Sequence, residues 1–316
     1  MSTSQPRIRL GVSACLLGER VRYDASHKRD DFVADVLSRY FELVPLCPEV
    51  AIGLGIPRPP IRLSGDPESP RAVGVKDPGL DVTERLTDQA RSVCRQHPDL
   101  SGYVLKARSP SCGMERVRIY HANGMPLASG PGVYARTLMS ERPLLPLEEE
   151  GRLNDAGLRD SFLDRVYLFH QWQSLLRDGL SAAALVRLHT EHKFLLMAYD
   201  QSTCRALGRL VASCGTQDVH ALGERYIRLA LDCMRTPARP GNHVNVLQHM
   251  AGFLSKRISA EDRAELSQAI DAYRLGEAPI VVALTLLRHH LRKQQESYLH
   301  GQRYLQPRPH ALNRTR

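Results

Sequence analysis

What this sequence lacks narrows what the chain can be. No apolar run approaches the ~18 residues that a bilayer-spanning helix needs, which predicts no membrane partner. The first seven residues carry no apolar core of the kind that signal peptides have. We therefore expect a cytoplasmic protein.

The common nucleotide-binding motifs are also missing. Neither a P-loop nor the glycine fingerprint of dinucleotide-binding folds is present, and there is no internal repeat or low-complexity tract. Hydrophobic residues make up 42% of the 316 residues and charged residues 24%, values typical of globular proteins. The length is enough for two domains of ordinary size.

Cysteine pairs with metal-finger spacing are absent. The chain has seven cysteines, an odd number, and in a reducing compartment we expect thiols, metal ligands or catalysts rather than disulfides. Cys15, Cys47 and Cys112 are separated by 32 and 65 residues, which matches no zinc or ferredoxin pattern. The other four lie in helical patterns, and Cys94 is expected to be a core thiol.

What the sequence does contain is a strand-like run before each of these three cysteines. The runs, in order, are 8–14, 41–46 and 102–107. With helical patterns between them, the order is that of a small α/β layer with a parallel sheet. Carboxyl ends of parallel strands meet at one edge, where sites are built. Three thiolates there would suit a soft metal or an iron–sulfur cluster, whereas scattered buried thiols remain the alternative.

Polar side chains accompany these thiols. Glu49 lies two residues beyond Cys47, where a carboxylate could act as general acid or base, or cap a turn. Ser109 and Ser111 precede the third cysteine and could orient a substrate, or be ordinary turn residues. Lys106 could be a charge partner or a solvated side chain.

The segments around these motifs are expected to be less regular. Residues 55–79 are rich in proline and glycine and predict loop or short extended pieces. Their cations are expected mainly to solvate the loop: Arg58, Arg62, Arg71 and Lys76. Thr83 is predicted to be the N-cap of the next helix, and residues 143–154 are predicted to be a connector.

The second half of the chain is helical in pattern and basic. Residues 151–316 hold 23 Lys/Arg against 15 Asp/Glu, whereas residues 1–150 hold 20 against 19. We predict an α/β domain over 1–150 and an all-α domain over 151–316. The charge suggests that this half holds a polyanion through phosphate contacts, and a surface that is merely solvated is an equal alternative. We assign these contacts to Lys193, Arg288, His289, Arg292 and Lys293.

Several motifs resemble known families, and they occur in the expected order. Those at 12–18, 21–24, 47–50 and 106–113 resemble the DUF523 family, typified by the 2-thiouracil desulfidases. The helical half resembles DUF1722, around 192–197, 245–249 and 284–290. The combination is similar to fused desulfidases that act on 4-thiouridine in tRNA.

The resemblance implies a site and a reaction. A 4Fe–4S cluster would be held by Cys15, Cys47 and Cys112, leaving one iron open for a thiocarbonyl sulfur. Glu49 and Ser109 would take part in catalysis. The reaction would convert thiolated uracil, as tRNA, nucleoside or nucleobase, to uracil with release of sulfide and no net redox change.

The same motifs supply candidate substrate-binding residues. These are Ser13, Asp24 and Lys106. One departure is visible, because the family often has glycine after the aspartate, whereas Ala25 and Ser26 follow Asp24 here.

Two other functions remain open at this point. The chain could be a tRNA-binding protein with a structural metal site and no desulfurisation. It could also be a metal-free enzyme with a cysteine nucleophile, for which His27 and His121 are the only histidines near the loops that could activate a thiol.

Overall fold

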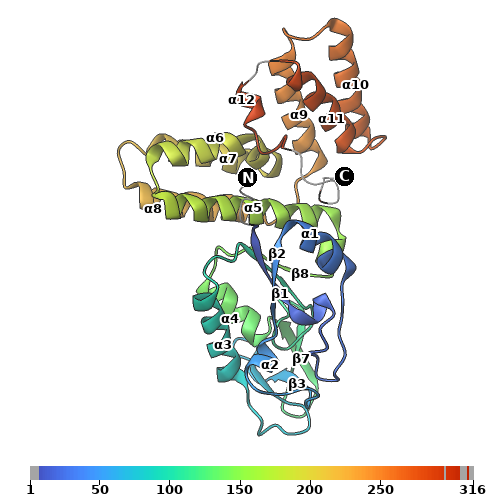
Figure 1. The fold of residues 1–316 in the computed structure, drawn as a ribbon, viewed down its shortest axis with the longest axis vertical. Helices are drawn as coiled ribbons and strands as arrows, with labels where there is room; N and C mark the ends of the chain where they lie inside the picture. Colours follow the sequence, from blue (N-terminus) through green and yellow to red (C-terminus); the bar gives the residue numbers. More distant parts are fainter. Residues whose placement is uncertain (1–6, 295–296, 307–311, 313–316) are drawn as a thin grey trace, which may run out of the picture. The chain divides into compact units, whose positions relative to one another are not determined.

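The computed structural model describes residues 7–294, 297–306 and 312. The chain divides into two compact units, Met1–Asn154 and Asp155–Arg316 (Figure 1). The first unit combines strands and helices and the second is helical, which confirms the predicted fold class. The first six residues, on which the expectation about a signal peptide rests, lie outside the described residues. Among the described helices, none is both long and apolar enough to cross a bilayer.

A four-stranded parallel sheet forms the centre of the N-terminal unit. Its strand order is β2 (Glu42–Leu46), β1 (Arg9–Ser13), β5 (Gly102–Leu105) and β8 (Leu147–Glu149). β1 therefore pairs with β2 on one side and with β5 on the other. The chain changes its winding direction at β1, and in open α/β sheets such a switch point is where ligand sites form.

β8 corrects the prediction of a connector over 143–154. Glu148 and Glu149, which belong to this strand, are buried. The side chain of Arg152 donates to Glu148 at 2.6 Å, and the backbone N–H of Met114 donates to Glu149 at 2.7 Å. These partners offset the cost of burying the carboxylates, so an acidic segment can pair as a strand.

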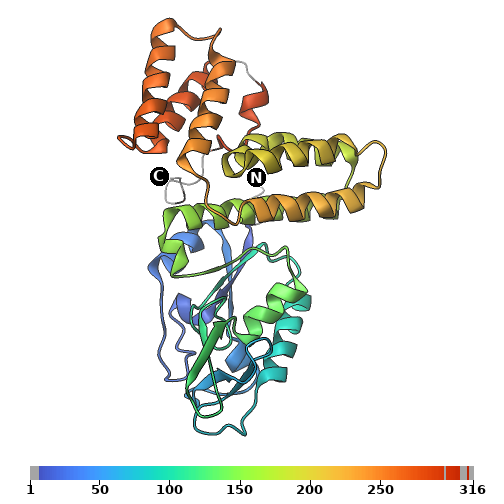
Figure 2. The ribbon, with the colours of Figure 1, turned by 180° about the vertical axis from the view of Figure 1, so that it is seen from behind.

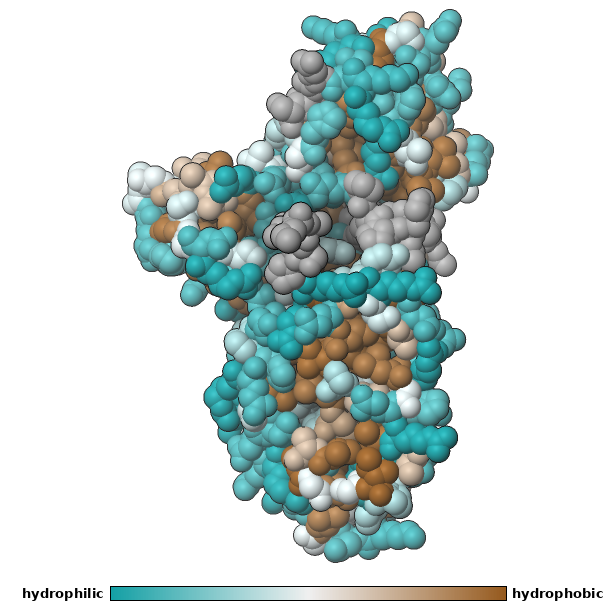
Figure 3. Space-filling view, in the orientation of Figure 1, coloured by the Kyte–Doolittle hydropathy of each residue, from teal (hydrophilic) through white to brown (hydrophobic). Residues whose placement is uncertain are grey.

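A second, mixed sheet takes two of its strands from residues 55–79, which were predicted to form loop or short extended pieces. Its order is β4 (Arg71–Gly74), β3 (Ile61–Ser64), β6 (Val117–Tyr120) and β7 (Pro126–Gly130). Alternate residues of β3 and β6 face a common core, as the twofold period of a strand requires. In Figure 3, hydrophobic residues also gather on the visible face of the N-terminal unit, so its surface is not uniformly polar.

Two helices of the N-terminal unit pack against each other, α3 (Thr83–Gln96) and α4 (Val133–Glu141). Figures 1 and 2 both show them side by side. The prediction that Thr83 caps α3 is wrong, because the N-cap position is occupied by Val82. The Thr83 hydroxyl instead accepts the backbone N–H of Ala72 at 2.9 Å. Shorter helical segments are η1 (Ala14–Leu17), η2 (Phe32–Leu37), α1 (Ser38–Tyr40), α2 (Pro48–Ala51) and η3 (Arg152–Asn154).

The C-terminal unit consists of helices joined by short turns. They are α5 (Ala156–Asp178), α6 (Ala182–Tyr199), α7 (Gln201–Ala212), α8 (Val219–Cys233), α9 (Pro240–Leu254), α10 (Ala260–Leu275), α11 (Ile280–Arg292) and α12 (Ser297–His300). α6 packs against α7, and α10 packs against both α9 and α11. Several begin at a side-chain cap: Asp155, Ser181, Asp200, Asp218 and Ser259 each accept backbone N–H groups.

A close contact between β1 and β5 explains a glycine in the middle of the sheet. Gly11 is paired in register with Tyr103, whose buried ring lies over the glycine. A Cβ atom on Gly11 would be 2.5 Å from the Tyr103 ring. Glycine is therefore required here so that the two strands that carry the predicted site can pair.

We expect Gly11→Ala to lower the free energy of unfolding by about 1–3 kcal/mol, because overpacking forces the ring or the strand to shift. Denaturant unfolding followed by circular dichroism measures this. Gly151→Ala is the matched control, since a Cβ there meets open space. Equal effects of the two substitutions would contradict the account of Gly11.

Candidate functional site

The three thiols line one cavity at the carboxyl edge of the parallel sheet. Cys15 follows β1 in η1, Cys47 follows β2 at the start of α2, and Cys112 lies in the loop after β5. The cavity has a volume of about 400 Å³ and is lined by all three residues. That volume is within the range of small-molecule sites. Parallel pairing thus brings together residues that are far apart in the sequence.

Burial sets the electrostatics of these thiols. It raises the pKa of Cys15 to about 11, and the neighbouring Cys47 adds to the shift. Burial likewise raises the pKa of Cys112, and the Ser13 hydroxyl acts in the opposite direction. Burial also raises the pKa of Cys47. Three thiolates could coexist here only with a positive centre bound to them, as in a metal site.

The donor set of the cavity limits the kinds of metal centre that it could hold. Three thiols are soft ligands, which suit zinc, copper(I) or an iron–sulfur cluster and disfavour magnesium and calcium.

Glu49 is fixed beside the thiols by a buried ion pair. The Arg58 guanidinium donates from Nε at 2.9 Å and from Nη2 at 2.8 Å to one carboxylate oxygen of Glu49. The Ser111 hydroxyl donates to the other oxygen at 2.8 Å. The side chain of Arg58 is 3% exposed, and that of Glu49 is 14% exposed. The carboxylate is thus held in one orientation at the cavity wall.

These hydrogen bonds leave the Glu49 carboxylate able to accept one more hydrogen bond. A carboxylate has about four acceptor positions, and Arg58 and Ser111 fill three of them within the described residues. The remaining position belongs to Oε1, the oxygen that Ser111 contacts. Glu49 lines the cavity and could therefore hold or accept one proton of a bound water.

Ser109 has a partner set different from that of Ser111. Its hydroxyl oxygen accepts the backbone N–H of Ser111 at 3.2 Å and that of Cys112 at 3.1 Å. This arrangement shapes the turn that presents the Cys112 thiol. Ser109 also lines the cavity, so a contact with substrate stays a prediction.

Ser13 and Lys106 tie the ends of β1 and β5 together. The backbone N–H of Lys106 donates to the Ser13 hydroxyl at 3.0 Å. The Lys106 ammonium pairs with Glu150, which also accepts the backbone N–H of Ala107 at 2.7 Å. Ser13 and Lys106 both line the cavity, with their polar groups already engaged in holding its walls.

Asp24 lies outside the group of residues that line the cavity. It is exposed, and its carboxylate accepts the Ser26 hydroxyl at 2.6 Å, which lowers the pKa of Asp24. Ala25 has a φ of 55°, in the left-handed region that favours glycine. The alanine at a position where the family often has glycine therefore adopts a strained backbone, while Ser26 closes the turn.

The loop that follows η1 folds back onto the site through its backbone. The carbonyl of Cys15 accepts the N–H of Lys28 at 2.9 Å, and the carbonyl of Tyr23 accepts the N–H of Arg58 at 2.9 Å. The Cys47 thiol lies 3.8 Å from the Val21 carbonyl oxygen, which it can donate to. Residues 19–28 are thus attached at several points around the thiols.

Sequence reasoning missed two residues of this site. Arg58 was expected mainly to solvate a loop, but it is buried and paired with Glu49. The resemblance implies a role for Ser109, but Ser111 is the serine that contacts Glu49. No local signal identifies Arg58, because its role depends on a carboxylate from a different segment.

The histidines considered for a metal-free cysteine nucleophile are placed elsewhere. His27 and His121 are exposed, and among the described residues no histidine lines the cavity. A thiol there therefore has no imidazole base beside it, which disfavours that mechanism. Cys94, on α3, is half-buried and does not line the cavity either.

The residues assigned to RNA lie on helices of the C-terminal unit. Four of the five are exposed: Lys193, His289, Arg292 and Lys293. Arg288 is half-buried, and its Nε donates to the carbonyl of Leu305 at 2.7 Å. Lys193 also lines a second cavity, of about 470 Å³, together with Arg205 and His249 and with no carboxylate among the described residues around it.

Comparison with known proteins gives two matching family models. A model described as 2-thiouracil desulfurase matches residues 10–150, and DUF1722, a family of unknown function, matches residues 193–309. "Uncharacterized protein YbgA" of Escherichia coli (strain K12) is 32% identical over 155 residues, which are 49% of this chain and 92% of that protein. A solved structure described as the 4Fe-4S-dependent thiouracil desulfidase TudS is 32% identical in sequence, with a TM-score of 0.37. The matched part is 48% of this chain and 94% of the TudS chain.

We expect Arg58→Met to destabilise the N-terminal unit by about 3 kcal/mol, because it leaves the Glu49 carboxylate partly buried without its countercharge. The double variant Arg58→Met/Glu49→Gln should lose less than the sum of the two single effects. Urea unfolding followed by circular dichroism gives all three values. Arg71→Met, which breaks an exposed ion pair with Asp81, should cost less than about 1 kcal/mol. Additivity of the Glu49 and Arg58 effects would contradict the ion pair.

Proposed function

Because the chain belongs to the 2-thiouracil desulfurase family, with a DUF1722 region following it, we propose that it is an iron–sulfur desulfidase for thiolated uracil. The proposed substrate is 4-thiouridine in tRNA or as a nucleoside. One observation carries the proposal, namely that three thiols and a fixed carboxylate line a single cavity at the switch point of the parallel sheet.

We infer that Cys15, Cys47 and Cys112 hold a 4Fe–4S cluster with one iron left without a protein ligand. When bound, such a cluster would supply a Lewis-acidic iron for the soft sulfur of a thiocarbonyl group. The donor set supports this cofactor, because the cavity offers three thiols and iron–sulfur clusters are held by cysteine thiolates.

The reaction is a hydrolysis and needs no electron donor or acceptor. The oxygen of one water forms a bond to the ring carbon, and the bond from that carbon to sulfur breaks. The two water protons leave with the sulfur as hydrogen sulfide, and the base becomes uracil. The protein must therefore hold the ring, orient the water and take up its proton for a time.

Glu49 is the residue best placed to handle that proton. Its Oε1 has an acceptor position left after Ser111 is counted, while Arg58 holds the other oxygen. Because the carboxylate cannot rotate without breaking these hydrogen bonds, its position is set before substrate arrives. We propose that Glu49 accepts a proton from the attacking water and that Ser111 positions Glu49.

The remaining predicted residues have supporting roles in this proposal. Ser13 and Lys106 keep the β1 and β5 ends together, and Ser109 orders the turn at Cys112. All three also line the cavity and remain candidates for contact with the substrate. Asp24 is proposed to act on the substrate only through the shape of its loop, since it does not line the cavity.

RNA binding is proposed for the helical unit. Lys193, Arg292 and Lys293 are exposed and have no ion-pair partner among the described residues, so they are available to phosphates. His289 is exposed as well, whereas Arg288 is engaged with a backbone carbonyl. Extruding a stacked base costs a few kcal/mol, which phosphate contacts can offset.

The cofactor proposal predicts a sharp difference among the cysteines. After anaerobic reconstitution, wild-type protein should hold about four irons and four sulfides per chain and convert 4-thiouridine to uridine. Cys15→Ser, Cys47→Ser and Cys112→Ser should each lose both iron and activity. Iron and acid-labile sulfide analysis, with chromatography of the nucleoside, makes the measurement.

Two controls separate the cluster from the chemistry. Cys94→Ser should keep iron and activity, because that thiol lies outside the cavity. Glu49→Gln should keep iron and lose activity by about 10²–10⁴-fold, the usual contribution of a general base. If all four cysteine variants behave alike, or if Glu49→Gln is fully active, the site assignment is wrong.

The tRNA proposal predicts an effect limited to the large substrate. Lys193→Ala should raise KM for thiolated tRNA and reduce the slope of log K against log salt by about 1. Its kcat/KM for a free thiolated nucleoside should be unchanged. Arg85→Ala, an arginine of the other unit outside the cavity lining, is the control. Tight tRNA binding with no loss of thiouridine would favour an RNA-binding protein without desulfurisation.

A further inference from the structure

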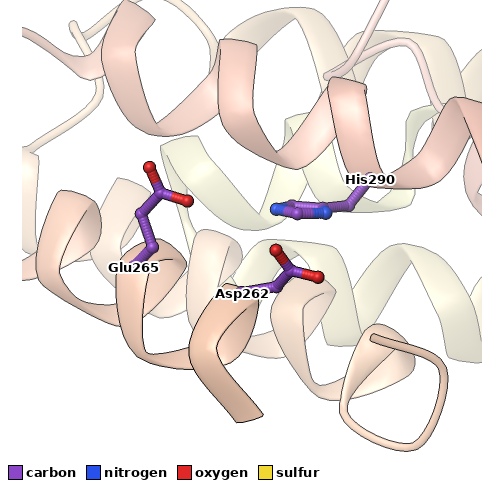
Figure 4. A group of neighbouring side chains, drawn as sticks. All are labelled: Asp262, Glu265 and His290. Carbon is purple, nitrogen blue, oxygen red and sulfur yellow. The ribbon is translucent and has the colours of Figure 1, made fainter. Parts of the chain in front are cut away.

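A second group of possible metal ligands lies in the C-terminal unit. Asp262 and Glu265 come from α10, and His290 comes from α11 (Figure 4). One ligand atom from each residue lies within 4.8 Å of the other two. Residues three apart on a helix share a face, so the two carboxylates are presented together to the histidine.

The state of His290 is the observation that points to a ligand. The residue is 4% exposed, and its Nε2 atom is buried with no hydrogen-bond partner in the described structure. Leaving a buried polar atom without a partner costs about 1–3 kcal/mol, so such atoms are rare in folded proteins. In Figure 4 the imidazole ring extends toward the space beside the two carboxylates.

The charges around the group favour a cation. Two negatively charged carboxylates lie beside one imidazole. The positive charge of Lys293 acts on Asp262 and partly offsets this negative charge. The pKa of Asp262 is lowered, chiefly by a hydrogen bond with Ser259 and further by His290 and Lys293, so the carboxylate is charged at neutral pH. Glu265 is exposed and Asp262 half-buried, which leaves solvent access for an ion and for waters that complete its shell.

We propose that Asp262, Glu265 and His290 bind one divalent first-row transition ion, of which Zn²⁺ is the best suited. A nitrogen donor with two carboxylates matches the ligands that zinc takes in proteins. Magnesium and calcium prefer shells made only of oxygen, so the imidazole disfavours them. The ion would give the buried Nε2 a partner and would bind α10 to α11.

The consequence of this site is structural. The two helices are joined by a short turn and already pack against each other. An ion bound by side chains from both helices stabilises the folded unit, because the unfolded chain has no preformed site. The proposal does not depend on the desulfidase reaction, since its ligands belong to the other unit.

The experiment uses the full chain with its iron–sulfur site reconstituted, so that free thiols do not compete for zinc. Equilibrium dialysis against Zn²⁺, followed by metal analysis, should give one zinc per chain in addition to iron. His290→Gln and Asp262→Asn should each weaken zinc binding by at least about tenfold, because even removing a group that hydrogen-bonds to a metal ligand can cause a loss of that size. Glu261→Gln, an exposed acid on the same helix, should leave it unchanged.

A second readout tests the structural role. Trp172 is the only tryptophan, is buried, and belongs to the C-terminal unit, so its fluorescence follows the unfolding of that unit. Zinc should raise the unfolding temperature in wild type and in Glu261→Gln, but not in Asp262→Asn. Absence of zinc from wild type, or equal binding by all variants, would overturn the proposal.

Discussion

Parallel pairing of β1 with both β2 and β5 is the constraint on which the N-terminal unit depends. Because the three strands run in the same direction, their carboxyl ends, and the cysteines that follow them, are brought to one edge. Gly11 permits the close approach of β1 to β5, and the hydrogen bond between Ser13 and Lys106 joins their ends. The cavity is therefore a consequence of the sheet order.

The chemistry at this edge depends on how buried charge is compensated. Burial disfavours thiolates, so a positive centre is needed before Cys15, Cys47 and Cys112 can be ligands together. Burial of Glu49 is offset by Arg58 and Ser111, which also fix its orientation. The three thiols would need a positive centre only when they ionise, whereas the charge of Glu49 is balanced by the chain itself.

Sequence reasoning works here where a signal is local. Strand-like runs ending at cysteines predict the strands that precede Cys15, Cys47 and Cys112, and helical periodicity identifies the second unit. It fails where the meaning of a residue depends on a distant partner. The segment around Glu148 looks like a connector until Arg152 is seen beside it, and Arg58 looks like a loop cation until its carboxylate is known. Asp24 shares a motif with the site, but its side chain bonds within its own turn.

Residues 19–28 are attached around the thiols mainly through their backbone. Backbone hydrogen bonds join this loop to Cys15 and Arg58, and the Cys47 thiol contacts the Val21 carbonyl. Any movement of the loop away from the cavity must break some of these bonds. The left-handed backbone of Ala25 costs more than glycine would at that position, so a residue that does not line the cavity affects how stably the loop is held there.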